Sequence, residues 1–137
     1  ELYRRMSMVK PLDGHYDIRA HSDGYQLIYT DMDDGDGIPM SLAELVKALE
    51  DDPSYEGQPI RIVACEAGRY DNGLARCVAD RLGADVLTPD STVYVEKDGR
   101  LILSPTDKEY YDVAEGKMKP TRRWRLFKPN GGDDDDV

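Results

Sequence analysis

A histidine and a cysteine each follow a segment with the pattern of a β-strand. His21 comes after the alternating residues 16–20, and Cys65 comes after the apolar segment 60–64. A thiol becomes a strong nucleophile when a base within reach takes its proton, and a histidine supplies such a base at neutral pH. Small-residue turns follow both positions and leave backbone N–H groups free to stabilise an oxyanion. The pair therefore predicts nucleophilic acyl transfer, provided that the fold brings the two side chains together.

Predicted helices separate the strands in a way that favours a parallel sheet. One helix begins at the capping box formed by Ser41 and Glu44, and a second covers 72–83, followed by a buried strand over 85–88. Strand–helix–strand connections of this length predict parallel pairing with right-handed crossovers. Neighbouring parallel strands end at the same edge, so the histidine and the cysteine are expected side by side there. Open α/β sheets bind their ligands at this edge.

The other predicted strands belong to the same single domain. A short strand over 25–29 returns after the histidine, and a hairpin is predicted from 92–95 and 101–103. A last strand is expected over 123–127. We therefore expect an irregular lead over 1–14, a single α/β domain over 15–129, and a disordered acidic tail over 130–137.

Composition excludes several functional classes. The 137 residues carry a net charge of −10, which argues against a general nucleic-acid binder because phosphate binding needs a positive field. No apolar run is long enough to span a bilayer, so no membrane partner is expected. Two cysteines do not form a disulfide scaffold. The chain begins with Glu1 rather than Met, which we interpret as a piece of a longer protein.

Each of these candidate residues also has a purely structural interpretation. Cys65 is also compatible with an ordinary buried cysteine and His21 with a residue that only ends a strand. Cys77 falls on the apolar face of its helix and is expected in the core. The acidic segment 31–37 lacks the spacing of a calcium loop and is expected to be a solvated loop. His15 is expected in a loop, and too few ligands remain for a zinc site, so no metal is predicted.

A basic patch near the C-terminus could bind an anion. Arg122, Arg123 and Arg125 lie beside Trp124, at the start of the last predicted strand and directly before it. A solvated strand face that balances the acidic tail is the competing interpretation. An anionic activator bound at these arginines is kept as a hypothesis, and no other cofactor is expected.

The segments 17–24 and 60–68 resemble the histidine and cysteine motifs of the caspase-like (clan CD) cysteine peptidases. More closely, residues 14–132 resemble domains at the carboxyl ends of bacterial polymorphic toxins. The resemblance implies a three-layer caspase-like α/β sandwich, with a mostly parallel central sheet, helices on both faces and an antiparallel hairpin near the C-terminus. It also implies that Cys65 is the nucleophile and His21 the general base and acid.

By the same resemblance, the backbone N–H groups of Ser22 and Cys65 would form the oxyanion hole. Ser22 stands where the family has a glycine, which departs from the pattern. Asp17, Asp23 and Glu66 could each favour a basic substrate side chain, and the sequence does not choose among them.

These features lead to two functional hypotheses. The first is a thiol peptidase that acts on a protein or peptide substrate as an effector or self-processing domain of a secreted bacterial toxin. It would be secreted or delivered as part of a larger protein and act in the cytoplasm of the target cell. The second is a catalytically degenerate module of the same fold, recognised by an immunity protein or by its parent chain.

Overall fold

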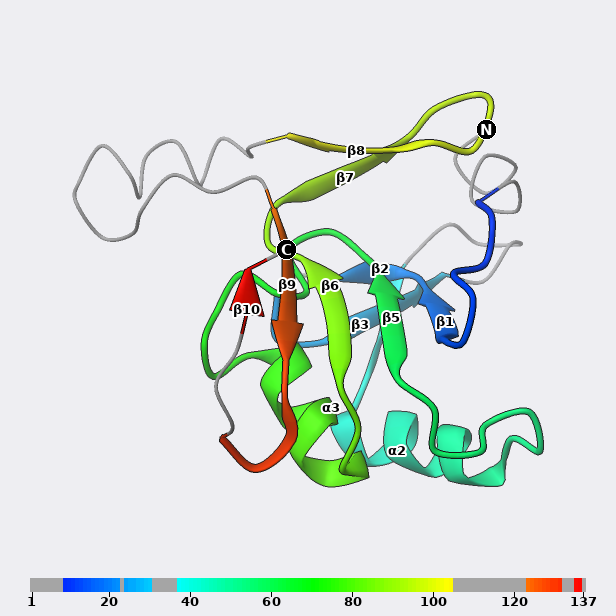
Figure 1. The fold of residues 1–137 in the computed structure, drawn as a ribbon, viewed down its shortest axis with the longest axis vertical. Helices are drawn as coiled ribbons and strands as arrows, with labels where there is room; N and C mark the ends of the chain where they lie inside the picture. The colour runs from blue at the N-terminus through cyan, green and yellow to red at the C-terminus, as the bar shows by residue number, and fades with distance from the viewer. Residues whose placement is uncertain (1–8, 23, 31–36, 105–122, 132–134, 137) are drawn as a thin grey trace.

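The computed structural model describes residues 9–22, 24–30, 37–104, 123–131 and 135–136. Its largest sheet has five strands in the order β1-β5-β6-β9-β10, and two smaller antiparallel sheets have the orders β2-β3-β4 and β7-β8 (Figure 1). The elements of the large sheet are β1 (Tyr16–Arg19), β5 (Ile60–Val63), β6 (Val86–Pro89), β9 (Trp124–Phe127) and β10 (Asp135–Asp136). The small sheets contain β2 (His21–Ser22), β3 (Leu27–Thr30) and β4 (Gly37–Met40), and β7 (Thr92–Val95) and β8 (Leu101–Ser104). The helical elements are α2 (Leu42–Asp51), α3 (Leu74–Leu82) and the 3-10 turn η1 (Pro129–Gly131).

The central sheet is mixed but mostly parallel where the candidate residues lie. β1, β5 and β6 pair in parallel, whereas β9 pairs antiparallel with β6 and β10 antiparallel with β9. The predicted mixed α/β class, its parallel strands and the C-terminal hairpin are therefore confirmed. The helices α2 and α3 are the crossovers that allow the parallel pairing.

Local sequence explains both helices. Ser41 caps α2 by accepting a hydrogen bond from the Glu44 backbone N–H at 3.1 Å, and the Ser41 N–H donates to the Glu44 carboxylate. Gly83 ends α3 in the left-handed conformation that glycine adopts without steric cost. The capping box predicted from the sequence is thus confirmed, and the predicted helix over 72–83 ends at its glycine.

The main core lies on one face of the sheet. Leu45 and Leu49 of α2 and Val78 of α3 pack in the same buried cluster as Ile60 and Ile62 of β5. Both helices therefore cover the same face. In the part of the chain described by the structure, no helix covers the opposite face, so the expected helices on both faces are not seen. The hairpin β7–β8 lies across the end of the sheet toward which β5 and β6 point (Figure 1).

Two regions differ from the sequence-based expectation. The segment predicted to be a solvated loop overlaps the start of β4. The sequence did not predict this strand because Pro39 has no N–H to donate a hydrogen bond to a neighbouring strand. β4 lies at the edge of its sheet, where proline is tolerated. Within the predicted disordered tail, η1 is described and β10 extends the sheet beyond β9. The acidic residues 31–36 lie outside the described residues.

Candidate functional site

The strand register aligns His21 with Cys65. β1 and β5 pair residue by residue from Tyr16 opposite Ile60 to Arg19 opposite Val63, and the Ala20 N–H continues the ladder to the Val63 carbonyl at 3.2 Å. Each candidate residue stands two positions beyond the last paired residue of its strand. Neighbouring strands are about 4.8 Å apart. The predicted placement of both residues at the same edge of the sheet therefore agrees with the register.

A buried ion pair fixes that register. Arg61 donates from Nε and Nη2 to the two carboxylate oxygens of Asp17 at 2.9 and 2.6 Å, and Nη2 also donates to the Lys10 carbonyl at 2.8 Å. The side chains of Arg61 and Asp17 are only 10% and 11% exposed. Their offset of 44 residues is the same as that between His21 and Cys65. A slip of one residue would break this pair and turn the side chains of the strand to the other face.

The loops that follow the two candidate residues contact each other. The Leu74 N–H donates to the Gly24 carbonyl at 3.0 Å, and Tyr25 stacks on Tyr70 with ring centroids 4.4 Å apart. Gly24 has a φ of +97°, and a Cβ atom there would lie 2.6 Å from the Tyr70 ring. A Cβ atom on Gly73 would lie 2.6 Å from the Gly24 carbonyl oxygen. The close packing explains why these two positions are glycines.

The Cys65 thiol is partly buried and is held by the hairpin. Its Sγ donates to the Val93 carbonyl of β7 at 3.6 Å. Burial raises the pKa of the Cys65 thiol above its ordinary value, and the neighbouring Glu66 carboxylate raises this pKa further. A raised pKa favours the protonated form of the thiol. It has to lose its proton to a base before or during attack on a substrate.

The residue after the cysteine has an unusual backbone. Glu66 has a φ of +60°, a left-handed conformation that is uncommon for a residue other than glycine and often marks a functional turn. Its N–H donates to the Ser91 carbonyl at 3.0 Å, which ties the turn to the end of β6. Its carboxylate pairs with Arg69 at 3.3 Å. Glu66 therefore already has a cationic partner in this structure.

The other candidates for a substrate pocket are not brought to the thiol. Asp17 is engaged by Arg61 inside the sheet, four residues before His21. Asp23 lies outside the described residues. The structure therefore gives no argument for a pocket made of these three carboxylates.

His21 is exposed and lies in β2, opposite Ile28 of β3. Among the residues that the structure describes, no hydrogen bond joins its ring to Cys65. Ser22, the other expected oxyanion-hole residue, accepts a hydrogen bond on Oγ from the Gly24 N–H at 2.9 Å. This hydrogen bond ties the Ser22 side chain to the backbone two residues later.

The described arginines of the predicted basic patch pair with different acidic residues. The Arg123 N–H donates to Asp90 at 2.9 Å, and its guanidinium lies 3.9 Å from the same carboxylate. Arg125 donates to Asp71 at 2.8 Å and stacks over the Phe127 ring. Arg122 lies outside the described residues. Arg123 and Arg125 each have an acidic partner of their own, Asp90 and Asp71, and an anionic activator at these arginines stays a prediction.

Sequence reasoning missed two polar residues at the end of β6. Asp90 and Ser91 are 2% and 0% exposed, and Asp90 Oδ2 and Ser91 Oγ have no hydrogen-bond partner among the described residues. They follow a parallel strand next to the one that ends at Cys65. The rule that located the histidine and the cysteine, polar residues at the ends of parallel strands, could have located these as well.

The described residues show neither a metal-binding cluster nor a membrane-spanning helix. They contain no group of three histidine, cysteine or acidic side chains arranged to hold a metal ion. None of the helices within them has the length and apolar character needed to cross a membrane.

Comparison with known proteins gives one match. No curated protein and no solved structure matches the chain. A family model described as "Domain of unknown function (DUF8616)" matches residues 1–103. This range includes β1, β5, both described helices and the hairpin. Because the match covers 103 of 137 residues, the chain belongs to the DUF8616 family.

Proposed function

We propose that the protein is a cysteine peptidase with a caspase-like fold, in which Cys65 is the nucleophile and His21 the general base and acid. The observation that carries this proposal is the β1–β5 register, which aligns the two residues at the carboxyl ends of neighbouring parallel strands. The two loops that leave these strand ends are packed together, which supports a single shared site.

The proposed reaction needs only these residues, a peptide and water. Cys65 Sγ attacks the peptide carbonyl while His21 takes the thiol proton, and His21 then gives that proton to the departing amine. Water cleaves the resulting thioester and restores the thiol. Because the thiol pKa is raised, proton removal by His21 has to accompany attack rather than precede it. The Cys65 N–H and one from the turn at Ser22 would bind the oxyanion.

In its biological context, the domain would be an effector or self-processing part of a secreted bacterial toxin. Its substrate would be a protein or peptide, and an immunity protein would be its natural antagonist. An effector of this kind would act in the cytoplasm of the target cell.

A second candidate function is a non-catalytic binding module of the same fold. The observation that favours it is the state of Cys65, whose thiol donates to the Val93 carbonyl and has a raised pKa. A thiol that stays protonated and bonded in this way would have a structural role. The module would then bind an immunity protein or the rest of its parent chain.

A peptide-based covalent probe separates the two functions. Peptide acyloxymethyl ketones, tested with Arg, Asp, Asn or Leu beside the reactive group, need both a nucleophile and an acid–base partner. We expect labelling of Cys65 in the wild type and its loss in His21→Ala, whereas His15→Ala, which removes the other histidine, keeps it. Absence of labelling by every probe, or equal labelling in His21→Ala, would support the binding module.

A further inference from the structure

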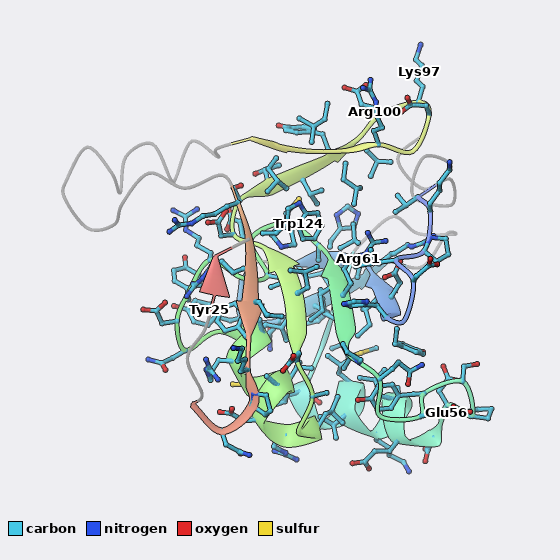
Figure 2. The ribbon with its side chains drawn as sticks, in the orientation of Figure 1. Tyr25, Glu56, Arg61, Lys97, Arg100 and Trp124 are labelled. Carbon is cyan, nitrogen blue, oxygen red and sulfur yellow. The ribbon has the colours of Figure 1, made fainter. Side chains whose placement is uncertain are left out.

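A cavity lies between the tip of the β7–β8 hairpin and the face of the sheet opposite the helices. Its volume is about 580 Å³, and its lining includes Lys10, Arg61, Asp98, Arg100, Leu101 and Trp124. Figure 2 shows Arg61 and Trp124 on the sheet below the hairpin, whose turn carries Arg100. The cavity is built from segments far apart in the sequence. The peptidase proposal makes no use of it.

The charge of this cavity is opposite to that of the whole protein. Among the described residues that line it, three are cations, Lys10, Arg61 and Arg100, and one is an acid, Asp98. Asp98 is paired with Arg100 at 3.0 Å. The chain as a whole has a net charge of −10. A local excess of positive charge in an acidic protein favours an anionic ligand.

Arg61 is already positioned to bind such a ligand. Its Nε and Nη2 are fixed by Asp17 and by the Lys10 carbonyl, whereas Nη1 makes no hydrogen bond to any residue that the structure describes. The side chain is 10% exposed, so it is rigid and lies in a region of low dielectric. A guanidinium group held in this way binds a carboxylate without further loss of side-chain entropy.

We propose that this cavity binds a carboxylate group flanked by an apolar group. Arg61 and Lys10 would hold the carboxylate, while the Trp124 indole and Leu101 would contact the apolar part. Asp17 and Asp98 offset two of the positive charges, which suits a monoanion better than a polyanion such as an inositol phosphate. The same chemistry is found in a free aromatic acid and in an acidic residue beside an apolar one in a peptide.

The single tryptophan of the chain makes the proposal directly measurable. Trp124 lines the cavity and is the only tryptophan, so its fluorescence reports binding there without a label. The probes are phenylacetate, its uncharged analogue phenylacetamide, the amide-capped dipeptide Phe-Asp, and inorganic phosphate. We expect saturable changes with phenylacetate or the dipeptide at concentrations up to about 20 mM. Tighter binding of the dipeptide would point to a peptide ligand, and tighter binding of phenylacetate to a small acid.

Variants at the rim keep the test independent of folding. Lys10→Gln and Arg100→Gln change exposed side chains and should weaken binding roughly fivefold each. Lys97→Gln is the matched control, since this exposed residue lies on the same turn but points away from the sheet (Figure 2). No saturable change with either carboxylate, equal binding of phenylacetamide or phosphate, or equal weakening in Lys97→Gln would overturn the proposal.

Discussion

At the scale of single residues, the chemistry depends on the protonation state of one thiol. Cys65 is partly buried, donates to the Val93 carbonyl and has a raised pKa. The reactive form of a cysteine is the thiolate, and a raised pKa reduces its amount at neutral pH. A simple alkylating reagent, which receives no help from acid–base catalysis, should therefore react slowly with Cys65.

This expectation can be measured as a pH profile. We expect alkylation of Cys65 by iodoacetamide to be slow at pH 7 and to reach half its maximal rate at a pH above about 8.5, the usual thiol value. Mass spectrometry of the digested protein measures the alkylation of Cys65 separately from that of Cys77, because the two cysteines lie in different peptides. A Cys65 profile with its midpoint below the usual thiol value would show a preformed thiolate and contradict the described environment.

At the scale of elements, the alignment of β1 with β5 determines the site. The buried pair of Asp17 and Arg61 has the same residue offset as the candidate pair, so it holds His21 and Cys65 at matching strand ends. Removing one member leaves a buried charge without its partner, which costs much more than removing both.

Asp17→Asn should therefore lower the free energy of unfolding by about 3–5 kcal/mol. The double variant Asp17→Leu with Arg61→Met should recover part of that loss, because it replaces both charges with apolar side chains. Urea denaturation gives both values. Arg100→Gln, in an exposed pair, serves as the control and should change stability by less than about 0.5 kcal/mol. A small effect of Asp17→Asn would mean that the pair does not hold the register.

The contact between the two loops gives a second test at this scale. Gly73→Ala would place a Cβ atom 2.6 Å from the Gly24 carbonyl oxygen, so the backbone has to shift, at a cost of about 1–3 kcal/mol. Gly57→Ala is the control, since it introduces strain at a positive φ in an open loop. We expect Gly73→Ala to reduce peptide-probe labelling of Cys65 and Gly57→Ala to leave it unchanged. Equal labelling in both variants would show that the loop contact does not shape the site.

The sequence predicted the elements well and the side-chain environment poorly. Periodicity and the capping box at Ser41 located both helices, and strand–helix–strand order gave the parallel pairing. The partner of Cys65 could not be predicted, because Val93 reaches it through a hairpin whose position depends on long-range packing. Arg61 falls within the segment 60–64 that the sequence predicts to be an apolar strand. Only the three-dimensional register shows that Asp17 compensates its charge.

At the scale of the whole molecule, the C-terminal tail closes one edge of the central sheet. β10 pairs with β9, opposite Leu126 and Arg125, at the end of the strand order away from β1. An open edge strand offers unpaired N–H and C=O groups to other chains. The tail also carries four of the acidic residues, Asp133–Asp136, which repel a second copy.

Deleting residues 132–137 should therefore promote self-association. The deletion removes β10 and four negative charges, so we expect a larger average mass by light scattering at concentrations where the full chain is monomeric. Replacing Asp133–Asp136 with asparagine removes the four charges but leaves the backbone of β10 in place. This variant therefore separates the effect of the charges from that of the exposed β9 edge. An unchanged average mass after the deletion would show that β10 is not needed to keep β9 from pairing with a second copy.

The proposed cleavage of peptide bonds by Cys65 can be tested in living cells. The most direct measurement is a proteome-wide search for new protein N-termini in bacterial cells that express the wild type or Cys65→Ala, with toxicity followed in parallel. We predict new cleavage ends and toxicity with the wild type, and loss of both with Cys65→Ala. Identical behaviour of the two proteins in both assays would contradict the peptidase and leave Cys65 with a structural role in a binding module.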